Sequence, residues 1–269
     1  MNLTRIILKD NTREYNKDEY LSLLKILTYP RIDEEELSRR LSELRKLEVE
    51  AIELSGPTRL NDLKVLGKGT MGIIVLGYWR GLRVAIKVLR TDVSATMERE
   101  ACYLKLANSV GVGPKLMRYS KNFLIREFID GDTLGDIVLR EKPRALLRIA
   151  LTTLYQAFKL DMVGLSHKEL ARPDKHIIIR RTDFKPFIVD FGAASITSSK
   201  KNLTQLIQYF FIKDSLCSSK IMSLKKRNYD FKVRLLILLK EYKRNPCQET
   251  FRKIVSLLKS YFPIDNYFD

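Results

Sequence analysis

Histidine and cysteine are scarce in this 269-residue chain, which holds two histidines and three cysteines. Cys102, Cys217 and Cys247 lie far apart and match no metal-binding spacing, which indicates buried, reduced thiols. No apolar run reaches the roughly 18 residues of a membrane helix, and residues 1–10 contain no apolar signal core. The sequence therefore predicts a cytoplasmic protein without membrane insertion.

Acidic residues are outnumbered, 32 against 49 lysines and arginines, which gives a formal net charge of +17. More than half of this excess lies in residues 200–269, where 15 basic and 6 acidic residues give +9. Such a segment attracts polyanions, so RNA or an RNA-bearing particle is a candidate partner. The alternative is a merely solubilising surface, because no aromatic-basic motif accompanies the charge.

The first 57 residues are predicted to form an N-terminal helical extension. Asn16 with Glu19, and Asp33 with Glu36, have the spacing of capping boxes, in which side chains satisfy the free amides of a helix start. Leucines then recur at helical spacing after each cap. Two helices followed by a strand at 49–54 are consistent with a reduced winged helix or with a helical brace, and the brace is favoured because a third helix is missing.

A turn signal at Ser55-Gly56-Pro57 marks the predicted end of this extension. From Leu60 to Phe128 the residues alternate as in antiparallel strands, most clearly at 73–76 and 83–89, with one helix near 94–107. Further on the spacing becomes helical. The predicted helices are 134–139, 144–158, 203–211, 231–242 and 249–261, and no internal repeat appears.

Four short motifs carry chemistry, and the first is rich in glycine. Gly67, Gly69 and Gly72 lie between two predicted strands, where their backbone amides can approach phosphate oxygens without a side-chain clash. A dinucleotide-binding fingerprint needs a helix after the glycines, so that interpretation is disfavoured. An ordinary glycine hairpin remains the alternative.

The second motif places a lysine in an apolar strand. Lys87 ends the run Val84-Ala85-Ile86, and an ammonium flanked by buried positions needs a partner, because desolvating an unpaired charge is costly. The following helix offers two carboxylates, Glu100 and Glu98. The register of a helix read from sequence is loose, so both stay open at this point.

The other two motifs lie downstream. Both histidines fall in the stretch Ser166–Ile179, where His167 begins a His-Lys-Glu-Leu sequence and His176 precedes an apolar strand. Fourteen residues after His176, Asp190 begins an Asp-Phe-Gly turn. An aspartate in such a turn presents the hard carboxylate oxygen that Mg²⁺ prefers.

These four motifs, in this order, resemble the protein-kinase-like superfamily over about residues 60–210. The resemblance implies an α+β, two-lobed fold, with a kinase-like N-lobe at 58–130 and a helical C-lobe at 131–269. Only about ten residues separate Gly192 from the next helix, and no Ala-Pro-Glu motif follows. A reduced C-lobe with such a short activation segment is similar to RIO kinases, the small kinase of the KEOPS complex and lipopolysaccharide kinases.

The resemblance also assigns roles in the nucleotide-binding half. Lys87 and the three glycines would hold the phosphates of ATP. Lys87 would pair with Glu100, whose Arg99-Glu100-Ala101 setting is similar to the kinase pattern, with Glu98 as the alternative. The backbone groups of Glu127 and Ile129 would hold adenine at the hinge. Arg126 departs from the family, which has an apolar residue there, so either the register differs or the back of the pocket is electrostatically unusual.

In the catalytic half, Asp190 would bind Mg²⁺ and Glu169 takes the place of the catalytic aspartate. The second metal ligand, usually asparagine, is Asp174 when counted from His167, or His176 when counted back from the strand. We favour His176 because strand register is the stiffer guide, although imidazole is a poorer magnesium ligand than oxygen. His167 is interpreted as a structural residue that packs the loop.

The sequence thus predicts a Mg-dependent, ATP-dependent phosphotransferase of the atypical serine/threonine kinase type. The acceptor, protein or small molecule, stays open. The alternatives are a nucleotide-binding pseudokinase that acts as a scaffold or ATPase switch on an RNA-containing particle, and a structural domain that binds no nucleotide.

Overall fold

The structure is a computed structural model that describes residues 4–226 and 230–263, and its chain divides into two compact units. The N-terminal unit consists of Met1–Lys105 and Pro114–Phe128, and the C-terminal unit of Leu106–Gly113 and Ile129–Asp269. The domain bounds 1–57, 58–130 and 131–269 stay a prediction, and residues 264–269 lie outside the described residues.

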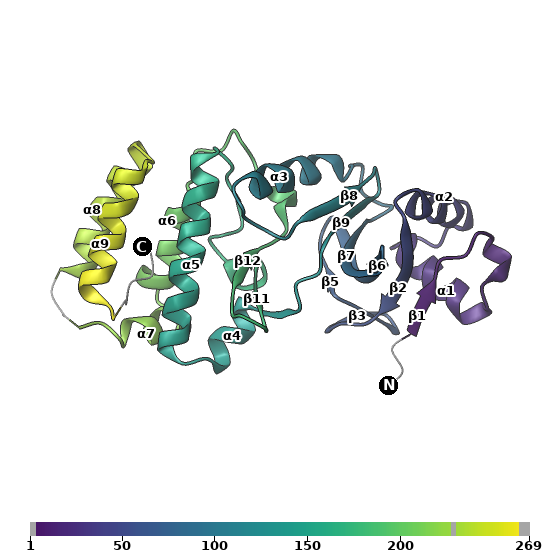
Figure 1. Ribbon diagram of the computed structural model, residues 1–269, viewed down its shortest axis with the longest axis horizontal. Helices are drawn as coiled ribbons and strands as arrows, with labels where there is room; N and C mark the ends of the chain where they lie inside the picture. The colour runs from purple at the N-terminus through teal and green to yellow at the C-terminus, as the bar shows by residue number, and fades with distance from the viewer. Residues whose placement is uncertain (1–3, 227–229, 264–269) are drawn as a thin grey trace. The chain divides into compact units, whose positions relative to one another are not determined.

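An antiparallel sheet forms the centre of the N-terminal unit, in the order β1-β2-β6-β7-β9-β8, with β5 paired to β6 (Figure 1). The strands expected at 49–54, 73–76 and 83–89 are confirmed as β2 and as parts of β6 and β7. The strands are β1 Thr4–Ile7, β2 Val49–Leu54, β5 Gly67–Lys68, β6 Gly72–Trp79, β7 Leu82–Leu89, β8 Leu116–Tyr119 and β9 Phe123–Glu127, with a separate hairpin of β3 Thr58–Leu60 and β4 Leu63–Val65.

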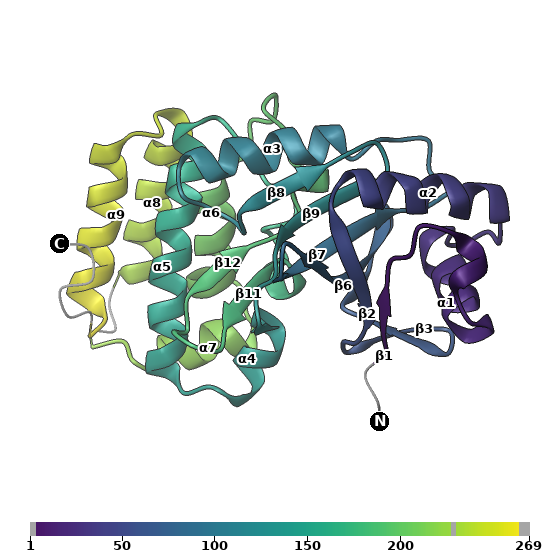
Figure 2. The same ribbon diagram turned by 45° about the vertical axis from the view of Figure 1, so that its right-hand side comes forward.

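The first two helices, α1 Lys17–Leu27 and α2 Glu34–Lys46, begin at the expected caps. Glu19 N donates to Asn16 Oδ1 at 2.9 Å and Asn16 N donates to Glu19 Oε2 at 3.1 Å, while Asp33 accepts from Glu36 N. Their leucines share one hydrophobic core with sheet residues such as Val75. Residues 4–57, all of which the structure describes, contain no third α-helix, so the brace stays the favoured prediction (Figure 2).

A buried arginine joins this brace to the sheet. Arg40 of α2 donates from Nη1 to the Leu27 carbonyl at 2.7 Å and to the Leu89 carbonyl at 2.5 Å, while Nε pairs with Glu36. Leu27 is the last residue of α1 and Leu89 the last of β7. One guanidinium group therefore binds both helices to the strand that carries Lys87.

Helix α3, Glu98–Ser109, begins four residues later than the sequence predicted. The cause lies in Met97, whose backbone N–H donates to the Lys121 carbonyl at 3.0 Å and whose side chain is buried. Because that amide is bonded to the β8–β9 turn, the preceding residues follow the turn instead of starting a helix.

The C-terminal unit is mainly helical, with α5 beside α6 and α8 beside α9 (Figure 1). The five expected helices are confirmed, except that the 203–211 segment turns π-helical after Ile207, while α7 and β12 were not predicted. No helix of the described residues is long and apolar enough to cross a membrane. Its elements are β10 Gly131–Thr133, α4 Leu134–Arg140, α5 Pro143–Met162, β11 Ile177–Arg180, β12 Pro186–Ile188, α6 Asn202–Ile207, α7 Leu216–Met222, α8 Phe231–Arg244 and α9 Gln248–Tyr261.

Mixed helices and antiparallel strands are compatible with the predicted α+β class. The small sheet of the C-terminal unit, in the order β10-β11-β12, matters most for the site, because β11 follows the loop that contains both histidines and β12 precedes Asp190.

Candidate functional site

The glycine motif forms the β5–β6 hairpin, in which Gly69 N donates to the Gly72 carbonyl at 2.8 Å. A Cβ atom on Gly72 would lie 2.4 Å from the carbonyl oxygen of Val88, so packing alone demands glycine there. At Gly67 and Gly69 the nearest atoms would be 3.7 Å away, an ordinary contact. Packing within the described residues therefore does not demand glycine at these two positions, and phosphate binding by this hairpin stays a prediction.

Lys87 lies beside this hairpin and is bound by a carboxylate. Its Nζ is 3.0 Å and 2.8 Å from the two carboxylate oxygens of Glu100, and both side chains are at least nine-tenths buried. A Cβ on Gly72 would lie 3.6 Å from Lys87 Cγ, so the ion pair and the hairpin are neighbours. Glu98 is exposed. The structure therefore pairs Lys87 with Glu100, while its role at phosphate stays a prediction.

The expected hinge residues lie at the end of β9 and just beyond it. Glu127 is the last residue of β9 and its N–H donates to the Lys115 carbonyl at 2.8 Å. Ile129 packs with Phe187 and Val189 in the C-terminal unit. Arg126 is buried within β9. A cationic residue therefore lies just before Glu127, where kinases have an apolar residue. Adenine binding by Glu127 and Ile129 stays a prediction.

The pairing of β11 with β12 brings His176 and Asp190 together. Ile177 pairs with Ile188, and the next amide, Val189 N, donates to the His176 carbonyl at 2.9 Å. Asp190 therefore follows directly after the residue opposite His176. Its backbone is left-handed, with φ of 66°, a conformation that is uncommon for a residue with a side chain and that concentrates at functional sites.

Glu169 completes a group of three potential metal ligands. One ligand atom each from Glu169, His176 and Asp190 lies within 4.8 Å of the other two. Glu169 Oε2 is 3.5 Å from His176 Nδ1, and this nitrogen is buried without a hydrogen bond. Two carboxylates and an unbonded imidazole nitrogen fit a divalent cation, because carboxylate oxygen and imidazole nitrogen both bind such ions.

Asp174, the other counted candidate for the second metal ligand, is bound elsewhere. The hydroxyl of Tyr209 donates to Asp174 Oδ1 at 2.6 Å. Burial, followed by this hydrogen bond, raises the pKa of Tyr209, so the phenol keeps its proton. The structure thus brings His176, and not Asp174, to Asp190 and Glu169.

His167 is fully buried beneath this group. Its Nε2 lies 3.0 Å from the Val189 carbonyl oxygen, and its backbone N–H donates to Asn202 Oδ1 at 2.7 Å. Burial lowers the pKa of His167 to about 4. A neutral, enclosed ring that packs edge-on against Phe191 and His176 has a structural role.

A buried polar network that the sequence did not reveal holds the start of this loop. Asp161 of α5 accepts from Asn202 N and Nδ2, from Leu203 N and from the hydroxyl of Tyr242. Asn202 Nδ2 also donates to the Leu165 carbonyl at 2.7 Å. Burial raises the pKa of Asp161 to about 6, against these donors. Asp161 stands among apolar residues on the buried face of α5, which was a signal of this network in the sequence. Nothing in the sequence marked Asn202 as its partner.

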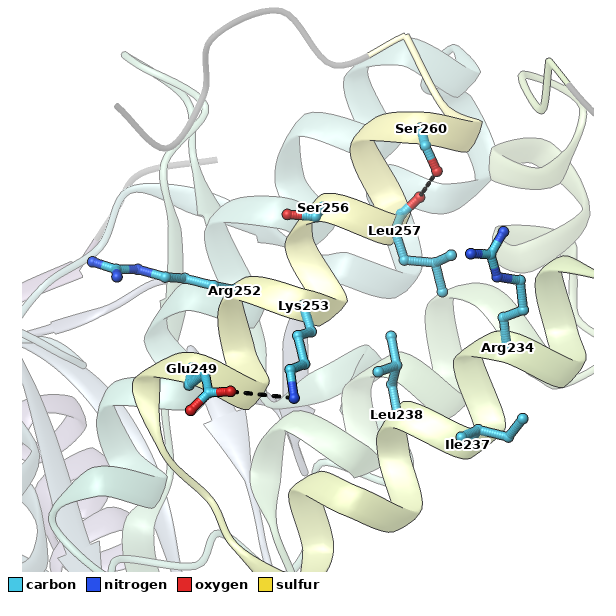
Figure 3. A pocket seen from close by; sticks show the side chains of 9 residues that line it. All are labelled: Arg234, Ile237, Leu238, Glu249, Arg252, Lys253, Ser256, Leu257 and Ser260. Carbon is cyan, nitrogen blue, oxygen red and sulfur yellow. Dashed lines mark hydrogen bonds and ion pairs between the residues drawn. The ribbon is translucent and has the colours of Figure 1, made fainter.

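A groove lies apart from these residues, between α8 and α9 (Figure 3). Its volume is about 630 Å³, and its apolar floor includes Leu238 and Leu257. Arg234 and Arg252 on its rim are exposed, whereas Lys253 is paired with acidic neighbours. None of the expected site residues lines this groove.

Comparisons with known proteins place the chain near serine/threonine kinases. No family model matches. The chain is 31% identical over 112 residues to serine/threonine-protein kinase D of Synechocystis, covering 39% of this chain and 21% of that kinase. It is 30% identical over 154 residues to a protein of Dictyostelium discoideum named as a probable serine/threonine-protein kinase, covering 51% of this chain and 24% of that protein. The chain thus spans about a fifth to a quarter of these kinases and is their distant homologue.

A shorter relative identifies the family to which the chain belongs. The chain is 35% identical over 85 residues to uncharacterized protein MJ1211 of Methanocaldococcus jannaschii, a match that covers 32% of this chain and 71% of that protein. The chain belongs to the family of this archaeal protein, whose name states no activity.

Proposed function

We propose that this protein is an ATP-dependent phosphotransferase of the atypical serine/threonine kinase type, similar to RIO kinases and to the small KEOPS kinase. The observation that carries the proposal is the close group of Glu169, His176 and Asp190. These residues belong to the motifs with which kinases bind the metal ion and the acceptor. Distant similarity to serine/threonine kinases supports the same conclusion.

In this proposal the two units correspond to the lobes of a reduced protein-kinase-like fold. The β5–β6 hairpin amides and Lys87 bind its phosphates, while Glu100 holds the lysine in place. Backbone groups of Glu127 and Ile129 hold adenine. Asp190 and His176 would hold Mg²⁺, which neutralises charge on the phosphates when bound.

Glu169 orients the acceptor hydroxyl and accepts its proton. Glutamate and aspartate have nearly the same intrinsic pKa, about 4.3 and 3.9, so the proton chemistry survives the exchange. The extra methylene moves the carboxylate by roughly 1.5 Å, a displacement that costs on the order of 10²-fold unless the loop compensates. Arg172 N donates to the Glu169 carbonyl at 3.0 Å and the Pro173–Lys175 turn follows, so the loop around Glu169 has a turn of its own.

The experiment is transfer of labelled γ-phosphate to the protein itself and to a panel of protein and small-molecule acceptors. Glu169→Gln should leave ATP affinity nearly unchanged and abolish transfer, whereas Glu169→Asp should impair it. Transfer by Glu169→Gln at the parent rate would place the base elsewhere. A parent protein that binds ATP and transfers phosphate to nothing would favour the pseudokinase.

The second candidate, a nucleotide-binding scaffold or ATPase switch on an RNA-containing particle, draws on the basic C-terminal segment. Arg234 and Arg252 are exposed on the α8–α9 rim. RNA affinity should fall steeply with salt, because each neutralised phosphate releases counterions. Joint replacement of both arginines by glutamine should flatten that salt dependence, and replacement of Arg13 and Arg39, exposed in the N-terminal unit, is the charge-matched control. If RNA binding is undetectable at low salt, the basic residues only form a solvated surface, and this second candidate function is contradicted.

A further inference from the structure

The three ligand atoms of the candidate metal site all come from the C-terminal unit. Glu169 and His176 lie on one loop, and Asp190 follows β12, whose pairing with β11 fixes the two ends of the site. Their atoms already lie within 4.8 Å of one another in the protein alone. The fold of the C-terminal unit therefore gathers the three side chains without a nucleotide.

The distance between Glu169 Oε2 and His176 Nδ1 fits two ligands of one metal ion better than a hydrogen bond between the two side chains. At 3.5 Å, Glu169 Oε2 and His176 Nδ1 are too far apart for a good hydrogen bond, and the nitrogen is buried with no other donor or acceptor. Such an unsatisfied buried group needs an explanation, of which a bound ion is one. Two ligand atoms about 2.1 Å from one ion are separated by roughly 3.0 Å at a right angle and roughly 3.4 Å at the tetrahedral angle.

The chemistry of the ligands distinguishes between classes of ion. Mg²⁺ dehydrates reluctantly and is usually bound through one or two carboxylates plus substrate phosphates. Imidazole nitrogen is a ligand for first-row transition ions, and carboxylates also accept Mn²⁺. One imidazole with two carboxylates therefore favours a transition ion over magnesium.

We propose that Glu169, His176 and Asp190 directly bind a divalent transition-metal ion of the Mn²⁺ class, without nucleotide and more tightly than Mg²⁺. The proposal rests on the proposed function for the use of the ion, and on the geometry for its binding. It makes Glu169 a metal ligand in the resting protein. A carboxylate has two oxygens, so Glu169 can face the ion with one and the acceptor hydroxyl with the other.

The test titrates the full-length, nucleotide-free protein with Mn²⁺, following free Mn²⁺ by electron paramagnetic resonance, and repeats the titration in competition with Mg²⁺. One Mn²⁺ ion should bind per chain, on the order of tenfold more tightly than Mg²⁺. His176→Asn restores the oxygen ligand that kinases use, and should lower Mn²⁺ affinity on the order of 10- to 100-fold while changing Mg²⁺ affinity little. Glu169→Gln should also weaken Mn²⁺ binding.

Asp174→Asn is the matched control, because its carboxylate is bonded to Tyr209 outside the group, and it should keep parental Mn²⁺ affinity. Far-ultraviolet circular dichroism verifies the fold of each variant. Absence of Mn²⁺ binding, an unchanged Mn²⁺ to Mg²⁺ ratio in His176→Asn, or unchanged affinity in Glu169→Gln would overturn the proposal. Binding of ATP in the presence of Mg²⁺, measured in parallel, separates this inference from the proposed kinase function. A protein that binds ATP but not Mn²⁺ refutes only this inference. A protein that binds Mn²⁺ but not ATP refutes only the kinase function.

Discussion

Replacement of Asn202 by aspartate changes one atom of the network under the catalytic loop. In the parent, Asn202 Nδ2 donates to Asp161 Oδ1 at 2.9 Å and to the Leu165 carbonyl at 2.7 Å, and its side chain has no exposed surface. An oxygen at that position turns both bonds into contacts between two acceptors. The backbone bond from His167 N to Oδ1 is kept, so the change removes the donor and adds a charge but leaves this acceptor in place.

The cost follows from burial. Leaving the buried Leu165 carbonyl without its Asn202 donor costs about 1–3 kcal/mol. Asp161 keeps its bond from Asn202 N, but the added carboxylate beside it adds repulsion in a low-dielectric site. We expect Asn202→Asp to lower the free energy of unfolding by about 3–5 kcal/mol at pH 8, a large part of the roughly 5–15 kcal/mol of an ordinary domain.

The dependence on pH has a definite sign. Repulsion from Asp161 raises the folded-state pKa of the introduced carboxyl group above its unfolded value, so the destabilisation is complete above that folded pKa and is relieved as pH falls below it. A protonated carboxyl group can again donate to Leu165 or Asp161.

Urea unfolding followed by circular dichroism at pH 8 and pH 5 measures this effect. Asn202→Ala adds no charge but loses the bond from His167 N to Oδ1 as well as both Nδ2 bonds, so a cost that depends more strongly on pH in Asn202→Asp than in Asn202→Ala reports the repulsion. A cost for Asn202→Asp below about 1 kcal/mol at pH 8, or one that does not shrink at pH 5, would refute the proposed network.

Three further predictions concern stability. Gly72→Ala should cost about 1–3 kcal/mol, because its Cβ would lie 2.4 Å from the Val88 carbonyl oxygen, whereas Gly69→Ala, with 3.7 Å of room, should stay close to the parent in urea unfolding. Asp161, with a folded pKa of about 6 against an unfolded 3.8, stabilises the fold below pH 3.8 and loses this contribution as pH rises through 6. From pH 4 to 7 the parent should therefore lose about 2 kcal/mol relative to Asp161→Asn, and parallel stability curves would contradict this. Arg40→Met should lower the free energy of unfolding by about 2–4 kcal/mol, because it leaves the Leu27 and Leu89 carbonyls unsatisfied. Arg39→Met breaks only exposed ion pairs and should change thermal stability little. Equal effects of the two substitutions would disprove the anchoring role of Arg40.

Local chemistry made part of this structure readable from the sequence. The caps at Asn16 and Asp33 involve residues three apart, so their spacing alone located both helix starts. Strand alternation placed Lys87 at a buried position, and counting back from the 177–179 strand placed His176 beside Asp190. Each of these inferences used a rule with a range of a few residues.

Contacts between distant segments were not readable. Strand β1 is short and pairs with β2, some 45 residues away, so no local signal marked it. The late start of α3 depends on the bond from Met97 to Lys121, and the loop anchor depends on Asn202, 35 residues beyond His167. Such choices are made by tertiary hydrogen bonds, which a single sequence does not display.

The central claim, that the protein binds ATP and that Lys87 and Asp190 each contribute to this binding, is tested most directly by calorimetric titration with ATP and Mg²⁺. Because Lys87→Ala leaves buried Glu100 unpaired, the double variant Lys87→Met with Glu100→Gln is measured beside it. Lys87→Ala, the double variant and Asp190→Ala should each weaken ATP binding on the order of tenfold or more while remaining folded, and Glu98→Gln, at an exposed position, should bind as the parent does. Unchanged ATP affinity in Lys87→Ala and Asp190→Ala, or no ATP binding by the parent, would contradict the claim.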